Sequence, residues 1–228
     1  MYRNHPEPGS NSGNRYLIGH HRQSDMTFAD QTINQFLENV AASAVTPSGG
    51  AVAAVGGAFG AALCEMVCIH TIEKDGYADV RPELTDIRDE LGTRRVRLLE
   101  LADEDSMAVD ELQAAFETPN DEDRAELVQE KSRRTAEVPL EIAETCLGVL
   151  EHARVVTAKG NRNAIADAGT GAFLAHSALK ASVFTVQSNL ELIEDPTAVA
   201  DIEARLAEID RRDDEALKQV EANIEEIA

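Results

Sequence analysis

The spacing of apolar and polar residues is helical along the whole chain from residue 27 onward. Over residues 28–44 the apolar side chains recur every three or four positions, as the stripe of an amphipathic helix requires. The same spacing recurs in five later segments, and no segment alternates with the period of a strand. The pattern predicts helices over residues 28–44, 48–74, 81–116, 121–158, 164–193 and from 197 to the C-terminus.

Helix breakers mark the ends of these segments. Thr46-Pro47-Ser48 opens the second helix, where a hydroxyl can cap the first amides, and Gly160 ends the fourth. Pro139 falls inside the fourth helix and is expected to kink it. The third helix would be roughly 50 Å long, which suits a bundle better than a crossover in a sheet. In the last helix a heptad-like seam is expected to pack on a neighbour: Val199, Ile202, Leu206, Ile209, Ala216, Val220 and Ile227.

The second helix, which begins in the stretch TPSGGAVAAVGGAFGAALCEMV, has almost no large side chains. Residues 51–64 carry no charge, but fourteen residues are too few to cross a membrane and Glu65 ends the run. Small residues let other backbones approach closely, so this segment is expected to be a central helix buried on all sides. The amides at Ser48, Gly49 and Gly50 lie at the positive end of the helix dipole, where they suit a carboxylate, a phosphate or a carbonyl oxygen.

Composition narrows the class of protein. The chain has 42 acidic and 21 basic residues among 228, a formal charge of −21, which disfavours nucleic acid and anionic membranes as partners. An acid-rich chain with few lysines suits a salt-rich cytoplasm, and its three cysteines are expected to be reduced core residues. Residues 1–25 lack an apolar period and are interpreted as a disordered, dispensable tail without an export signal, so that the domain spans residues 26–228.

Several segments carry a family resemblance. INQFLENVAASAVTPSGGAVAAVGGAFGAALCEMV, LLELADEDSMAVDELQAAF, DRAELVQEKSRRTAEVPLEIAE, GNRNAIADAGTGAFLA and FTVQSNLELIED resemble, in order and spacing over residues 30–195, the cyclodeaminase/cyclohydrolase family. That family comprises the C-terminal domain of formiminotransferase-cyclodeaminase and stand-alone methenyltetrahydrofolate cyclohydrolases. This chain departs from the family pattern at Ser48, where a third glycine is usual, and at Thr185-Val186, where the pair is usually Asn-Val.

The resemblance implies an all-α, up-and-down bundle that forms a homodimer and acts on a one-carbon derivative of tetrahydrofolate. The leading hypothesis is hydrolysis of 5,10-methenyltetrahydrofolate to 10-formyltetrahydrofolate, with no cofactor beyond the folate substrate and no metal. Because only 25 residues of different composition precede the bundle, no transferase domain is expected upstream. The alternatives are a formiminotetrahydrofolate cyclodeaminase and a non-catalytic bundle that binds folate or a protein.

The candidate site residues are carboxylates and polar groups within the matching motifs. Hydrolysis needs water to attack a cationic carbon and a proton to reach the departing nitrogen, which a carboxylate can manage. Asp105 and Asp167 lie beside small residues and are the candidates for this role, although each also suits a solvated helix face. The candidates for substrate binding are Ser48, Gly49, Gly50, Arg124, Lys159, Asn161, Arg162 and Asn189, with turn and surface roles as the alternatives. His70, His152 and His176 have no metal-ligand spacing.

Overall fold

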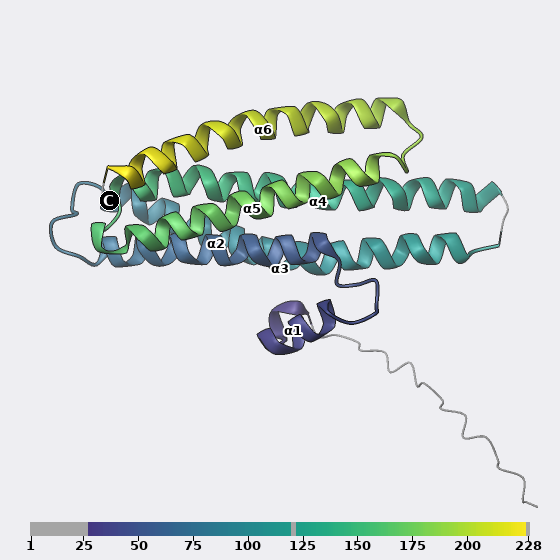
Figure 1. Ribbon diagram of the computed structural model, residues 1–228, viewed down its shortest axis with the longest axis horizontal. Helices are drawn as coiled ribbons and strands as arrows, with labels where there is room; N and C mark the ends of the chain where they lie inside the picture. Colours follow the sequence, from purple (N-terminus) through teal and green to yellow (C-terminus); the bar gives the residue numbers. More distant parts are fainter. Residues whose placement is uncertain (1–26, 120–121, 227–228) are drawn as a thin grey trace, which may run out of the picture.

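The computed structural model describes residues 27–119 and 122–226, and in this part of the chain every regular element is a helix. The 3-10 helices are η1 (Phe28–Asp30) and η2 (Arg162–Ala164). The α-helices are α1 (Ile33–Val40), α2 (Gly49–Ile72), α3 (Arg81–Glu117), α4 (Glu122–Lys159), α5 (Ile165–Leu190) and α6 (Pro196–Glu225). Figure 1 shows α2 to α6 running along one axis as an up-and-down bundle, which confirms the predicted fold class. Residues 1–25, interpreted above as a tail, lie outside the described residues.

Helix α2 lies at the centre of the packing, against α3, α4 and α5. Gly60 packs on the backbone of Gly171 in α5, and a Cβ at position 60 would lie 2.6 Å from the Gly171 carbonyl oxygen. By length and composition α2 is apolar enough to cross a membrane, but 50% of its most apolar window is buried inside the protein. The prediction that it is buried on all sides is wrong, because Val52, Phe59 and Ile69 are exposed.

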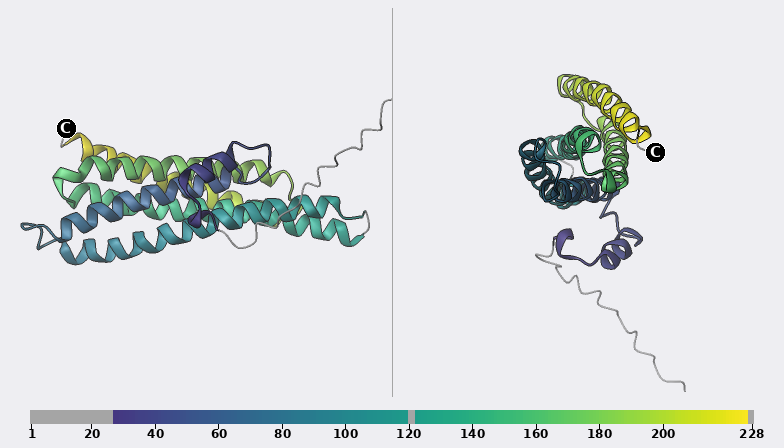
Figure 2. Two further views of the ribbon diagram at one scale, coloured as in Figure 1. Left: turned by 90° about the horizontal axis from the view of Figure 1, so that it is seen from below. Right: turned by 90° about the vertical axis from the view of Figure 1, so that its left-hand side faces the viewer.

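The first predicted helix is shorter than its apolar pattern. Only Ile33–Val40 form α1, opened by Thr32 in a reciprocal hydrogen-bond pair with Gln35. Phe36 is buried, whereas Ile33 is 67% exposed and Leu37 57% exposed. In Figure 2, right, α1 stands to one side of the bundle. The three- and four-residue spacing of apolar side chains therefore identified an amphipathic helix correctly, but most of its apolar face is exposed to solvent in the single chain.

Pro139 lies inside α4, as predicted, and has a partner on α5. Since proline has no amide hydrogen, the carbonyl oxygen of Thr135 lacks its intrahelical donor. Asn189 supplies one, with its Nδ2 donating to the Thr135 oxygen at 2.6 Å. Asn189 thus connects α5 to α4 at the point where the proline interrupts the hydrogen bonds of α4.

Helix α6 packs on α4 and α5 through the predicted seam. Asp195 caps its first turn by accepting a hydrogen bond from the amide of Thr197 at 2.9 Å. Five of the seven seam residues are buried and Val199 is partly buried, while Ile227 lies outside the described residues: Ile202, Leu206, Ile209, Ala216 and Val220. All three cysteines are free and buried, as expected.

Candidate functional site

The N-terminus of α2 is closed by a carboxylate from α3. The Asp105 Oδ2 accepts hydrogen bonds from the Ser48 hydroxyl at 2.6 Å and from the Ala51 amide at 2.9 Å. The Ser48 side chain itself caps no amide, so the prediction that a local hydroxyl caps α2 is wrong. Asp105 takes that role from another helix and serves as the acceptor for Ser48.

The glycines at this end of α2 differ in their surroundings. A Cβ at Gly50 would overlap the Asp105 carboxyl group, whereas a Cβ at Gly49 would meet nothing within 4 Å. Gly50 is buried and Gly49 is exposed. Glycine at position 50 therefore makes room for the carboxylate, and Gly49 leaves the helix end open to an approaching molecule.

Asp105 has an unusual electrostatic environment. Its side chain is only 3% exposed, and burial raises the pKa of its carboxyl group above 3.8, although the hydrogen bonds from Ser48 and Ala51 oppose this. A carboxyl group with a raised pKa exchanges a proton more readily near neutral pH than an ordinary aspartate does. The α2 amides and dipole also favour an oxygen that carries partial negative charge. At this end of α2, a carboxylate that can accept a proton therefore lies beside backbone amides that can donate hydrogen bonds.

A second group of the predicted residues lies at the opposite end of α2. The Asn161 backbone amide donates to the Thr71 hydroxyl at 2.8 Å, and its side-chain oxygen accepts from Lys74 Nζ at 2.8 Å and from the Asn163 amide at 3.1 Å. Asn161 is buried and serves as the cap of η2. These contacts describe a turn residue that ties the α4–α5 connection to the C-terminal end of α2.

Two cations flank that turn. Lys159 forms an ion pair with Glu83 of α3, its Nζ lying 2.7 Å from Oε2. The backbone amide of Arg162 donates to the Tyr77 hydroxyl at 3.3 Å, and its side chain is exposed. Both residues, with Tyr77, line a hollow of about 330 Å³. Glu226 lines the same hollow, so carboxylates offset part of the positive charge there.

Asp167 lies near this second group rather than near Asp105. It is exposed in the first turn of α5, one residue before Ala168, whose carbonyl oxygen lies 3.8 Å from Cys64 Sγ. Asp105 contacts α2 at Ala51, thirteen residues earlier, which is about 20 Å along the helix. Within one chain the two candidate carboxylates are therefore apart.

Asn189 lies in the last turn of α5 and Arg124 in the first turn of α4. The Asn189 amide group is used in the contact with Thr135 described above. Arg124 Nη2 donates to the Phe116 carbonyl oxygen at 2.9 Å, across the end of the α3–α4 hairpin. Arg124 also lines a shallow hollow of about 490 Å³ with Glu126 and Glu194. Both residues thus have structural contacts on the same side of the molecule as Asp105.

Two buried hydroxyls on α3 and α4 were not singled out from the sequence. Ser106 follows Asp105, and Ser132 is fully buried on α4. Neither hydroxyl oxygen has a hydrogen-bond partner within the described part of the chain. Serine at a buried position of a long helix is the signal that could have identified them.

Comparison with known proteins identifies the family. A model of the formiminotransferase-cyclodeaminase family matches residues 32–208, most of the chain. The chain belongs to this family. Over 186 residues it is 35% identical to a methenyltetrahydrofolate cyclohydrolase of Methylorubrum extorquens, covering 79% of this chain and 88% of that protein. It is also 25% identical over 190 residues to the formimidoyltransferase-cyclodeaminase of Sus scrofa, covering 81% of this chain but 35% of that longer protein.

A solved structure of the family agrees with the fold. The crystal structure of formiminotetrahydrofolate cyclodeaminase from Thermotoga maritima superimposes with a TM-score of 0.82 at 28% identity, over 87% of this chain and 98% of that one. Both groups of candidate residues fall within the 32–208 match, so the family domain contains the whole predicted set. Helix α6 is matched over its first part only.

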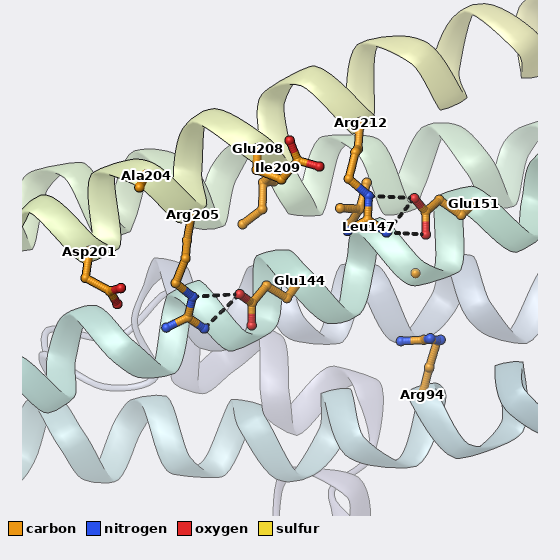
Figure 3. A pocket seen from close by; sticks show the side chains of 11 residues that line it. Arg94, Glu144, Leu147, Glu151, Asp201, Ala204, Arg205, Glu208, Ile209 and Arg212 are labelled. Carbon is orange, nitrogen blue, oxygen red and sulfur yellow. Dashed lines mark hydrogen bonds and ion pairs between the residues drawn. The ribbon is translucent and has the colours of Figure 1, made fainter.

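Other polar groups of this family member have structural partners. Between α4 and α6 lies a hollow of about 440 Å³ in which Arg205 pairs with Glu144 and Arg212 with Glu151, while Arg94 lies below (Figure 3). His152 contacts Glu90 and His176 contacts Asp213. No group of three or more metal-ligating side chains occurs among residues 27–119 and 122–226. These pairs join neighbouring helices and leave the two ends of α2 as the candidate site.

Proposed function

We propose that this protein hydrolyses 5,10-methenyltetrahydrofolate to 10-formyltetrahydrofolate. The observation that supports this most directly is the buried Asp105 carboxyl group against the open N-terminus of α2. The identity of 35% to a protein named methenyltetrahydrofolate cyclohydrolase, over 88% of its length, gives the reaction class. The proposed substrate carries its one-carbon unit as a flat cation, which suits a site bordered by carboxylates.

The chemistry requires one water and returns one proton to solvent. A water oxygen attacks the carbon that bridges N5 and N10, and Asp105 accepts the water proton as the C–O bond forms. The hydroxyl of the resulting tetrahedral adduct loses its proton as its oxygen becomes the formyl carbonyl, while the carbon–N5 bond breaks and N5 takes a proton from Asp105. In this proposal the amides at Gly49 and Gly50 stabilise the partly negative oxygen. The products are 10-formyltetrahydrofolate and one released proton.

A cyclodeaminase is the second candidate. The matches to the Thermotoga maritima and Sus scrofa proteins, both named cyclodeaminases, favour it. Ring closure with loss of ammonia passes through a similar tetrahedral carbon that carries nitrogen in place of oxygen, so the same groups would serve. A bundle that binds folate without turnover is the third candidate.

Purified protein in high-salt buffer distinguishes these three functions. We expect it to accelerate the loss of the methenyl absorbance well above the spontaneous rate. Ammonia release from formiminotetrahydrofolate, with the methenyl form left at its background rate, would establish the cyclodeaminase. Folate binding without either reaction would establish the non-catalytic bundle. Chelator-treated protein should keep its activity, since we propose no metal or further cofactor.

We further propose that the protein is a homodimer that works in a salt-rich cytoplasm. Two copies with a charge of −21 each repel one another, so they can approach only through a face without carboxylates. The exposed side of α2 is such a face, because residues 49–64 carry no charged side chain while Val52 and Phe59 are exposed. The uncovered apolar residues of α1 adjoin it around a cavity of about 310 Å³.

A further inference from the structure

One arginine in the hollow between α4 and α6 lacks the partner that its neighbours have. Arg205 donates two hydrogen bonds to Glu144, at 2.9 and 2.7 Å, and Arg212 donates two to Glu151, both at 2.9 Å. Arg94 of α3 lines the same hollow of about 440 Å³. Its Nε is shielded from solvent and has no hydrogen-bond partner in the part of the chain that the structure describes.

The ion pair that Arg94 does form is weak. Its Nη2 lies 3.9 Å from the Glu90 Oε2, and the same oxygen contacts His152 Nε2 at 2.8 Å. The Glu90 side chain is 59% exposed, so water screens its charge, whereas the Arg94 side chain is only 33% exposed. A guanidinium group that has lost much of its water needs an acceptor at hydrogen-bond distance, and Glu90 does not supply one.

Gly148 makes room for this guanidinium group beside α4. A Cβ at position 148 would overlap the Arg94 Cζ and Nη1, so any other residue there would displace the group. Figure 3 shows Arg94 below Leu147 and the Arg212–Glu151 pair. The side chain of an α3 residue thus reaches the hollow because α4 has a glycine at this point.

The carboxylates that line the hollow are directed to other partners. Glu144 and Glu151 accept from Arg205 and Arg212 as described, and both oxygens of Glu208 accept from Arg211, at 2.9 and 2.6 Å. Asp201 lies one turn before Arg205 on α6, on the far side of that arginine from Arg94 (Figure 3). Beside Arg94 the hollow therefore has a cation to be matched by an acceptor from solution.

The remaining walls indicate the kind of molecule that would fit. Leu147 and Ile209 are each 3% exposed and line the hollow, so they offer a small apolar contact. A guanidinium group binds a carboxylate through two parallel N–H···O bonds. With Asp201 nearby and a net charge of −21, a monoanion is disfavoured less than a dianion such as phosphate. The volume lies within the usual range for small-molecule sites, about 300–1,000 Å³.

We propose that the hollow between α4 and α6 binds a small organic monocarboxylate, with its carboxylate on Arg94 and its apolar body on Leu147 and Ile209. This site is separate from both ends of α2, and the proposal does not depend on the folate reaction or on the dimer. A bound molecule would contact α3, α4 and α6 at once. It should therefore hold α6 more firmly on the bundle.

Fluorine NMR with 4,4,4-trifluorobutyrate as the probe tests the proposal. The unsubstituted protein should broaden the probe signal in potassium chloride buffer. Added butyrate should displace the probe and restore the narrow line. Butyramide, which has the same shape without the charge, and phosphate at equal concentration should not displace it.

Three variants locate the probe. Arg94→Met removes the guanidinium group and should weaken binding about tenfold or more. Gly148→Ala leaves the charge of the protein unchanged but displaces the guanidinium group, so it should weaken binding as well. Arg88→Met is the matched control, because Arg88 lies on the same helix and its side chain has the same exposed fraction of 33%. This control should bind the probe as the unsubstituted protein does.

Hydrogen exchange needs no variant and decides the case if a substituted protein does not fold by circular dichroism. Butyrate should slow the exchange of amides 204–212 of α6 in the unsubstituted protein, and butyramide should not. Probe binding that is absent from the unsubstituted protein, unchanged in folded Arg94→Met, or equally weakened in Arg88→Met would overturn the proposal. Displacement by phosphate but not by butyrate, or exchange in α6 that butyrate leaves unchanged, would also overturn it.

Discussion

At the scale of single residues, Asp105 determines the character of the candidate site. It satisfies the Ala51 amide at the start of α2, accepts the Ser48 hydroxyl and is almost fully buried. The proposed catalytic role and the observed structural role therefore fall on one side chain. The two roles can be distinguished by variants that remove the charge of Asp105 and by variants that fill the space beside its carboxyl group.

The pH dependence of turnover should report the Asp105 carboxyl group. As a proton acceptor it must be ionised, and burial raises its pKa above 3.8, so kcat/KM should rise with pH through that higher pKa. Asp105→Asn should remove this limb as well as most of the activity. An unchanged limb in the residual activity of the variant would assign the titration to another group.

The same shift has a consequence for stability. The folded-state pKa is raised, so the stability linked to this group is fully present below pH 3.8 and is lost as pH rises through the raised value. Denaturant unfolding of the unsubstituted protein and of Asp105→Asn across that pH range should show a smaller loss in the variant.

Gly50→Ala tests the space around the carboxylate. A Cβ at position 50 overlaps the Asp105 carboxyl group and would displace it from Ser48 and Ala51, at a cost of about 1–3 kcal/mol in the free energy of unfolding. Gly49→Ala, with nothing within 4 Å, is the matched control and should be neutral or slightly stabilising. Equal melting temperatures for the two variants would contradict the close contact.

At the scale of elements, neighbouring helices are joined where a side chain of one helix forms a hydrogen bond with an unpaired backbone group of another. The clearest case is the Thr135 carbonyl oxygen. Pro139 has no amide hydrogen to donate to it, and Asn189 of α5 donates a hydrogen bond to it instead. Asn189, a candidate for substrate binding in the sequence analysis, therefore also has a structural role.

A double-mutant cycle separates these two roles of Asn189. Asn189→Ala leaves the carbonyl oxygen without its donor and should cost about 1–2 kcal/mol of stability. In Pro139→Ala the new amide hydrogen can bond to Thr135, so adding Asn189→Ala should then cost much less. If turnover falls in Asn189→Ala and stays low in the stable double variant, Asn189 also contacts the substrate. Additive stability losses would contradict the proposed coupling.

At the scale of the whole molecule, charge and the exposed apolar face act against each other. The 42 carboxylates are expected to keep copies apart in dilute salt, whereas the exposed apolar face of α2 would favour the proposed association. Ionic strength therefore decides which effect is larger.

Salt should stabilise both the fold and the proposed dimer. The screening length is about 10 Å at 0.1 M and about 3 Å at 1 M, so carboxylate repulsion across the surface weakens as salt is added. The melting temperature and the dimer fraction should both rise from dilute buffer to molar potassium chloride. A melting temperature that does not change over that range would refute the adaptation to high salt.

The sequence determined the class of fold and most helix boundaries. The period of three and four residues, with Arg81-Pro82 and Asp195-Pro196 as breakers, located α3 and α6 because hydrophobic spacing and capping act within a few turns. The family resemblance selected segments that lie at the two ends of α2. The end of α1 and the open face of α2 were missed because spacing shows which face is apolar, not what covers it.

Only the tertiary structure decided which side chains meet. The cap of α2 comes from Asp105, 57 positions after Ser48, and the donor for Thr135 comes from Asn189, 54 positions later. No local pattern links such residues, since helix packing brings them together. The same packing separates Asp105 from Asp167 by about 20 Å along α2. Asp105 lies on α3 beside the start of α2, whereas Asp167 lies on α5 near Cys64, thirteen residues farther along α2.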